Sequence, residues 1–274
     1  MESEGRRWSE MAADCLSLIF RRLSLEDLAV GVPFVCKSWH RASLDPLCWT
    51  LLDFHDIDFM PWSRFSREFS DRYAVPRFSF SGFLRLCVAR SRGSAVELAF
   101  PLLFGASLRD LHVAKECTKL RKVILPNLAS EDEPHLPEIV AKWGELEWLE
   151  MESKPSSFLE TAAQIGRSSN SVVGLKMHGA IKKEDAAAIV DRLPDLKFLC
   201  LSRSYLPREE LSAIVHGCKN LERLCARDCV GFEADEEVVK WCSGIKSFEH
   251  EGSKVFDEFG YDTDECDPLY VHVI

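Results

Sequence analysis

The strongest constraint on the fold is an apolar triplet that recurs along the chain at a nearly fixed period. In each copy, apolar residues take the first, fourth and sixth positions, as in Leu221, Leu224 and Ala226. The copies begin 24 to 26 residues apart, at Ala95, Leu120, Leu146, Val172, Leu196, Leu221 and Ile245. In the last copy, His250 takes the sixth position. A unit this small cannot bury its own apolar face, so successive units must stack on one another.

Between the triplets, three stretches carry apolar residues at helical spacing. They are residues 186–193, 207–216 and 233–241. Pro207 suits a first helical turn, while Gly217 and Gly244 stand where a helix would stop. Because side chains alternate along a strand, triplet positions 4 and 6 point into the core, and positions 3, 5 and 7 line the opposite face. The pattern predicts an α/β chain in which each unit is a short strand, a loop and a helix.

The eleven cysteines show neither a disulfide framework nor a metal motif. Their number is odd, and no Cys-x-x-Cys pair occurs. A zinc site made from Cys218, Cys225, Cys229 and Cys242 is the alternative, but the paired short spacings of structural zinc sites are missing. We therefore expect mostly buried free thiols, with no metal and no cofactor. Cys200 and Cys225 both fall at position 5 of their triplets, where surface thiols are expected.

Charge and hydropathy narrow the class of partner. The chain has 34 basic and 44 acidic residues, a net charge of -10, and no basic stripe. It is thus poorly suited to bind nucleic acid or an anionic membrane, and proteins are the expected partners. No run of 18 apolar residues exists to span a bilayer, and no apolar stretch follows the charged N-terminal residues, so a secretory signal is not expected. We expect a reducing location, cytoplasmic and/or nuclear.

About fifty N-terminal residues do not follow the repeat and predict a small helical unit. One helical face collects Leu16, Ile19, Phe20 and Leu23. Ser24, with Asp27 three residues later, is typical of a cap that opens a second helix. Pro33 removes a backbone hydrogen bond within that helix, so a kink is expected there.

Residues 8–54 also resemble the F-box. The matching motifs are Asp14-Cys15-Leu16 with Ile19 and Leu23, Asp27-Leu28, Val35-Cys36-Lys37-x-Trp39, and Asp45-Pro46-Leu47-Cys48-Trp49. The triplets resemble leucine-rich repeats of the cysteine-containing class, which carry one cysteine three residues before the triplet and another eight after its first position. Cys117, Cys218 and Cys242 take the first of these places, and Cys229 takes the second. Together the two parts are similar to plant F-box/leucine-rich-repeat proteins.

This resemblance implies a fold and a function. The implied fold is a helical F-box followed by a right-handed leucine-rich-repeat solenoid, with parallel strands on the concave face and helices outside. The implied function is substrate recognition in an SCF-type cullin ubiquitin ligase. The F-box would dock on an SKP-family adaptor, and through it on a cullin, while the repeats bind the protein to be ubiquitinated. Such a receptor is not an enzyme, and the sequence contains no Gly-x-Ser-x-Gly, His-Glu-x-x-His or phosphate-binding glycine loop.

The resemblance also implies which F-box residues meet the adaptor. The expected contacts are Met11, Leu16, Ile19, Leu23, Leu28, Val35, Cys36, Trp39, Leu47 and Trp49. One departure concerns the start of the motif, where the family usually has Leu-Pro and this chain has Met11-Ala12. Because alanine lacks the backbone angle that prepares proline for a first helical turn, weaker adaptor binding is expected.

Alternation along the strands predicts the substrate-binding residues of the concave face. They are Trp148, Glu150, Lys176, His178, Phe198, Arg223 and Arg227, within a wider stripe that includes Ser202, Glu249 and Glu251. Large aromatic side chains such as Trp148 and Phe198 are typical interface anchors when they face outward. The neighbouring basic residues suit an acidic or phosphorylated peptide.

The expected domains are the F-box at 8–54, a connector at 55–92 with one helix around 83–89, about seven repeats at 93–256, and an acidic tail at 257–274. Residues 269–274 of the tail could add a terminal edge strand, because position 269 lies 24 residues beyond Ile245. Two other functions remain open. One is a non-ligase leucine-rich-repeat scaffold with a degenerate F-box-like cap, and the other is a small-molecule receptor.

Overall fold

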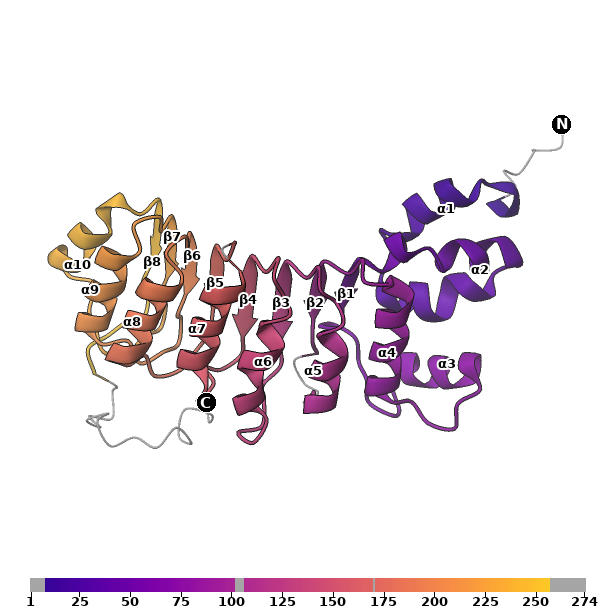
Figure 1. The fold of residues 1–274 in the computed structure, drawn as a ribbon, viewed down its shortest axis with the longest axis horizontal. Helices are drawn as coiled ribbons and strands as arrows, with labels where there is room; N and C mark the ends of the chain where they lie inside the picture. The colour runs from indigo at the N-terminus through magenta and orange to yellow at the C-terminus, as the bar shows by residue number, and fades with distance from the viewer. Residues whose placement is uncertain (1–7, 102–105, 170, 257–274) are drawn as a thin grey trace. The chain divides into compact units, whose positions relative to one another are not determined.

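The computed structural model describes residues 8–101, 106–169 and 171–256 (Figure 1). The chain divides into two compact units, Met1–Val172 and Val173–Ile274. Both combine parallel strands with helices, which confirms the predicted α/β fold. The acidic tail and its possible edge strand at 269–274 lie outside the described residues. Within the described ranges, no helix is both long enough and apolar enough to cross a bilayer.

The first unit begins with a group of short helices. They are η1 (Trp8–Glu10), α1 (Ala13–Phe20), the π-type turn η2 (Asp27–Gly31), η3 (Val32–Phe34), α2 (Lys37–Ser43) and η4 (Pro46–Trp49). Ser24 makes the predicted cap, since its hydroxyl accepts a hydrogen bond from the Asp27 N–H at 3.1 Å and donates one to the Asp27 carboxylate at 3.0 Å. The prediction of one kinked helix after Ser24 is wrong. Pro33 lies in η3 and Cys36 is extended, with φ -162°, so the helix stops and α2 starts anew.

Four parallel strands pair in chain order in this unit: β1 (Leu51–Asp53), β2 (Glu97–Ala99), β3 (Lys122–Leu125) and β4 (Trp148–Met151). Their central residues Leu52, Leu98, Val123 and Leu149 stand side by side and are all buried. The helices of this part are α3 (Arg64–Tyr73), α4 (Phe80–Ser91), α5 (Leu108–Ala114), η5 (Glu133–His135), α6 (Leu136–Val140) and α7 (Phe158–Ser168). Figure 1 shows α4, α5 and α6 following one another along one side of the strands.

β1 adds a triplet that the periodicity missed. Trp49, Leu52 and Phe54 occupy its first, fourth and sixth positions, and all three are fully buried. Trp49 precedes Ala95 by 95 − 49 = 46 residues, because the connector is inserted between β1 and β2. The β1 triplet therefore falls outside the periodic series, which begins at Ala95.

The connector has an aromatic core of its own. It contains α3, which the sequence did not indicate, and α4, which extends the helix predicted around 83–89. The fully buried ring of Phe83 lies at its centre. Five other phenylalanine rings have their centroids 5.0 to 6.2 Å from it, those of Phe54, Phe59, Phe65, Phe69 and Phe78. Residues from α3, α4 and the loops that follow β1 and α3 thus share one core.

A polar joint links the N-terminal helices to this core. Trp49 donates its indole N–H to the Ser43 carbonyl at 2.8 Å, and the Arg90 guanidinium lies 4.9 Å from the Trp49 ring centroid. Arg90 also donates to the Tyr73 hydroxyl at 3.0 Å, and that hydroxyl donates to the Ala29 carbonyl at 2.8 Å. A continuous set of contacts therefore runs from η2 through α3 and α4 to the end of η4, just before β1.

The second unit has four parallel strands, β5 (Gly174–Lys176), β6 (Phe198–Cys200), β7 (Arg223–Cys225) and β8 (Ser247–Glu249). Between them lie α8 (Lys183–Arg192), α9 (Arg208–Gly217) and α10 (Glu236–Trp241), at the three stretches where helices were predicted, and the short η6 (Cys242–Gly244) directly after α10. Beyond the strands, single parallel bridges join Ala180, Tyr205, Val230 and Lys254 in turn. The triplets of β5, β6 and β7 are buried, whereas the β8 triplet of Ile245, Phe248 and His250 is half-buried.

The repeat cysteines are structural. Cys117, Cys218 and Cys242 are buried, and burial raises the pKa of each thiol to about 11. Cys229 is also buried, and its thiol donates a hydrogen bond to the Leu201 carbonyl at 3.1 Å. This carbonyl, directly after β6, thereby gains a hydrogen-bond partner. Cys200 differs from its expected place on the surface, since only 8% of the residue is exposed. Among the described residues, no group of three His, Cys, Asp or Glu side chains could hold a metal ion.

The aromatic core yields a stability prediction. Replacing Phe83 by alanine should lower the free energy of unfolding by about 3–5 kcal/mol, because the change removes a fully buried ring and leaves a cavity. Phe256 is 71% exposed, so Phe256→Ala is a matched control that should change the free energy of unfolding by less than about 0.5 kcal/mol. Urea unfolding followed by circular dichroism measures both. Equal midpoints for the two variants would contradict a folding role for the aromatic core.

Candidate functional site

The predicted adaptor contacts divide into three groups by exposure. Ile19, Val35 and Leu47 are exposed, with Val35 the most open at 58%. Met11, Leu23, Cys36 and Trp39 are half-buried. Leu16, Leu28 and Trp49 are at most 2% exposed, and their contact with an adaptor stays a prediction that this burial does not favour. These three side chains pack inside the unit and support the surface from below.

The two apolar sides of α1 explain this division. Leu16 and Phe20 are one helical turn apart and point into the unit, where Phe20 packs edge-on against Trp39 with ring centroids 5.2 Å apart. Leu18 and Ile19 point outward instead. A single helical stripe therefore contains both core and surface residues, because the helix is apolar over more than one face.

Sequence reasoning missed three exposed apolar residues in this region. Leu18 is 58% exposed, and Trp8 and Phe34 are also exposed. Trp8 is held in place through its carbonyl, which accepts a hydrogen bond from the Trp39 indole at 3.3 Å. The Phe34 ring packs edge-on against the Tyr73 ring, with the two centroids 5.7 Å apart, so Phe34 also contacts the connector. A count of large apolar residues next to the stripe, rather than only on it, would have indicated Leu18.

Cys36 places a thiol of altered acidity on the same surface. Its pKa is lowered, first by the hydrogen bond with the Ser38 hydroxyl, 3.1 Å from its sulfur, and then by the Trp39 backbone. The extended backbone at Cys36 leaves the thiol beside the start of α2, where backbone N–H groups stabilise a negative charge.

The predicted substrate residues are split between the two units. Trp148 and Glu150 lie on β4 in the first unit, where both are half-buried and the Trp148 indole donates to the Glu150 carboxylate at 2.8 Å. On a neighbouring strand of the same unit, Lys122 pairs with Glu97 across β3 and β2 at 3.8 Å. The outward face of this unit thus combines an aromatic side chain with paired charges.

In the second unit, Phe198 and Arg223 are register partners on β6 and β7. The exposed Arg223 guanidinium lies 5.7 Å from the Phe198 ring centroid, a cation–π contact on the outward face.

Lys176 ends β5 and is half-buried. His178 follows it, and its Nδ1 donates to the Ser202 carbonyl at 2.5 Å while Nε2 accepts from Arg203 at 3.4 Å. His178 is thus a bridge between successive turns rather than a metal ligand.

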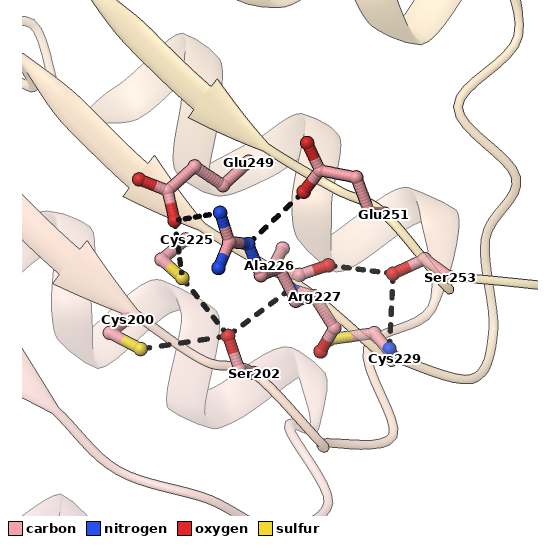
Figure 2. Close-up of polar contacts among 9 residues, drawn as sticks. All are labelled: Cys200, Ser202, Cys225, Ala226, Arg227, Cys229, Glu249, Glu251 and Ser253. Atoms are coloured by element: carbon pink, nitrogen blue, oxygen red, sulfur yellow. Dashed lines mark hydrogen bonds and ion pairs between the residues drawn. The ribbon is translucent and has the colours of Figure 1, made fainter.

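Arg227 is engaged within the protein. Figure 2 shows its guanidinium between two carboxylates, Glu249 at 3.2 Å and Glu251 at 3.1 Å. These neighbours raise the pKa of Arg227, with Glu249 the first cause, and offset its positive charge. The expectation that Arg227 attracts an acidic peptide is therefore weakened, whereas Arg223 keeps the orientation that such a contact requires.

Comparison with known proteins agrees with this geometry. Residues 8–51 match the F-box domain family. The Arabidopsis thaliana F-box protein SKIP19 is 28% identical over 267 residues, which cover 96% of this chain and 83% of that protein. An F-box/LRR-repeat protein of the same plant is 29% identical, over 80% of this chain and 71% of its own length. The F-box protein FBW2, also from this plant, is 27% identical, over 87% and 73%.

The class of protein follows from these findings. The chain carries an N-terminal F-box domain followed by a repeat fold of strands and helices. Its homologues are F-box and F-box/LRR-repeat proteins, 24 to 29% identical over most of the chain, which confirms the resemblance to F-box/leucine-rich-repeat proteins.

The effect of having Ala12 where the F-box family usually has proline can be tested by measuring protein stability. Ala12 is the residue before α1, with φ -56° and ψ 141°, a conformation that a proline ring also adopts. We expect Ala12→Pro to raise the free energy of unfolding by about 0.4–1 kcal/mol, because proline restricts the unfolded chain. Ala89 is an exposed alanine inside α4, and Ala89→Pro should destabilise the protein as a control. Thermal unfolding measures both; a loss of stability in Ala12→Pro would show that residue 12 does not tolerate the family's proline.

The two arginines of the second unit should respond differently to charge reversal. Arg227→Glu places a third carboxylate beside Glu249 and Glu251, so it should lower the melting temperature more than Arg223→Glu does. The difference should shrink at high salt, where exposed charges are screened. Melting curves of both variants at low and high salt make the comparison, and equal shifts at low salt would show that the two ion pairs contribute nothing.

Proposed function

We propose that this protein is the substrate-recognition subunit of an SCF-type cullin ubiquitin ligase. The observation that carries the proposal is the group of large apolar side chains exposed on the F-box, Trp8, Leu18, Ile19, Val35 and Leu47. Large exposed apolar groups mark interaction sites because exposing them to water is unfavourable. In this proposal an SKP-family adaptor covers them, in a helix-packing mode of recognition.

The joint between the F-box and the first strand supports a division of labour. Trp49 closes the F-box and begins the triplet of β1, while Arg90 and Tyr73 connect both to the connector helices. A partner bound to the F-box would thereby be held at a set position relative to the strands of the first unit. We propose that a cullin is recruited through the adaptor, and that the protein promotes ubiquitination by proximity, without chemistry of its own.

The substrate is proposed to bind on the outward strand faces. In the first unit the supporting features are Trp148 and Glu150, and in the second they are the Phe198–Arg223 pair. Aromatic and arginine side chains are the groups that most often dominate interface energetics. We also propose a cytoplasmic or nuclear location, which fits the ten described cysteines, all of them free thiols.

One observation favours a second candidate, a scaffold whose F-box serves only as a structural cap. Trp49 is wholly buried and shared by η4 and the β1 triplet, so the F-box also covers the first edge of the repeats. Terminal repeats of solenoids require such a cover. A binding experiment separates the two functions, because only the ligase subunit needs the outer F-box surface.

We expect the protein to co-elute with an SKP-family adaptor in size-exclusion chromatography. Val35→Asp puts a charge on an exposed apolar position and should weaken adaptor binding by roughly tenfold to a hundredfold, or about 1–3 kcal/mol. Val239→Asp is the matched control, since Val239 is a 47% exposed valine on α10 in the other unit. Isothermal titration calorimetry gives the dissociation constants.

Val35 is exposed, so its substitution tests adaptor binding without disturbing the folded core. Substitution of buried Leu28 would damage the core, so loss of binding there would be ambiguous. If the wild-type protein and Val239→Asp fail to bind the adaptor while both remain folded, the scaffold becomes the better function. Equal binding by Val35→Asp and wild type would remove Val35 from the adaptor surface.

A further inference from the structure

Two thiols meet on the strand face of the second unit. Cys200 on β6 and Cys225 on β7 are register partners in adjacent parallel strands, so their side chains point to the same side of the sheet. Both contact one hydroxyl: the Cys200 thiol donates to Ser202 Oγ at 3.6 Å, and that oxygen lies 3.1 Å from the Cys225 sulfur (Figure 2). No other cysteine pair of the described chain is placed by strand register in this way.

The backbone spacing permits a covalent bond between them. Neighbouring strands lie about 4.7–4.9 Å apart, and disulfides form at Cα separations of about 4.4–6.8 Å. Parallel register partners therefore satisfy the first requirement for a disulfide without any movement of the strands. The two sulfurs also lie near the same Ser202 oxygen, so both thiols point toward one place on the strand face.

Exposure assigns different roles to the two thiols. Cys225 is half-buried and reachable from solvent, whereas Cys200 is 8% exposed. A small reagent can thus reach Cys225, and Cys200 needs only to reach its neighbour. Attacking and resolving thiols of disulfide chemistry have this relationship.

We propose that Cys200 and Cys225 form a dithiol modification site that reacts with low-molecular-weight disulfides to give a disulfide between β6 and β7. Cys225 releases its proton to solvent, and its sulfur attacks one sulfur of the reagent, whose S–S bond breaks and releases one thiol. Cys200 then loses its proton and attacks the Cys225 sulfur of the mixed disulfide, releasing the second thiol. Two protein thiols are oxidised, and one reagent disulfide is reduced to two thiols.

The surroundings of Cys225 control the rate of this reaction. Charged groups face it from two neighbouring segments: Glu249 on β8 accepts a hydrogen bond from the thiol at 3.3 Å, and Arg227 beyond β7 pairs with that same carboxylate. Burial is the first cause that raises the pKa of Cys225 to about 11; the neighbouring Cys200 thiol and the hydrogen bond to Glu249 add to it, whereas the hydrogen bond with Ser202 lowers it. The thiolate is therefore scarce at neutral pH, and the rate should rise about tenfold per pH unit up to that value.

The bond would also change the strand face. Cys225 would lose the proton that it donates to Glu249, and Cys200 the one that it donates to Ser202. Glu249 would keep Arg227 as its partner. Oxidation would thus cross-link two repeats and rearrange the network in Figure 2 while leaving the ion pairs of Arg227 in place. This inference does not depend on adaptor binding by the F-box.

The test is tryptic peptide mapping by mass spectrometry after incubation of the full chain with glutathione disulfide at about pH 7 and about pH 9. Cleavage after Lys197, Arg203, Arg223 and Arg227 gives peptides 198–203 and 224–227, each with one cysteine. We expect a cross-linked pair of these peptides that forms faster at the higher pH and disappears on reduction. Cys200→Ser should instead accumulate glutathione on Cys225, because the resolving thiol is gone. Cys15→Ser, at an exposed cysteine of the other unit, should leave the cross-link unchanged.

Two results would overturn the proposal. One is glutathione that persists on Cys225 in the wild-type protein, which would show that the Cys200 sulfur does not reach it. The other is a folded chain in which both peptides stay unmodified while the same chain in denaturant reacts. Circular dichroism of the wild-type and Cys200→Ser proteins before the reaction confirms that folded chains are compared.

Discussion

The burial of Trp49 is the contact on which the first unit depends. Its indole closes the F-box through the Ser43 carbonyl, its ring lies beneath the Arg90 guanidinium, and its position opens the triplet of β1. A large aromatic side chain stabilises the folded state by the apolar area that it buries, and a buried indole N–H also needs a hydrogen-bond acceptor. Both requirements hold the Trp49 ring in one position. Because one residue satisfies helices on one side and a strand on the other, the F-box and the first repeat share a core.

That shared core decides which apolar residues remain for a partner. The stripe of α1 was expected to face an adaptor as a whole, but Leu16 is used inside the unit, as is Leu28 in η2. Leu18, Ile19 and Val35 are left outside. A helix that is apolar on two sides can serve folding and recognition together, because each side meets a different environment.

The cysteines show how one residue type takes several roles by position. Before a triplet, Cys117, Cys218 and Cys242 fill small buried spaces, and Cys229 satisfies a carbonyl at a turn. At position 5, Cys200 and Cys225 instead meet across two strands beside Ser202. The spacing of the repeat sets these positions, so neither a metal nor a disulfide framework is required to explain why the residues cluster in sequence.

The sequence by itself determined the repeat, the strands within it, the three helices of the second unit and the F-box, because periodic apolar residues and local motifs act over short distances along the chain. It did not identify β1 as the first strand of the repeat, because its triplet lies 46 residues before the next one. It also did not indicate α3, whose Phe65 gains its meaning only from rings of α4 and of the segment before α4. Nor did it separate Leu16 from Ile19, or show that Arg227 is held by Glu249 and Glu251. Those outcomes were decided by tertiary structure, since burial and charge pairing depend on segments that only folding brings together.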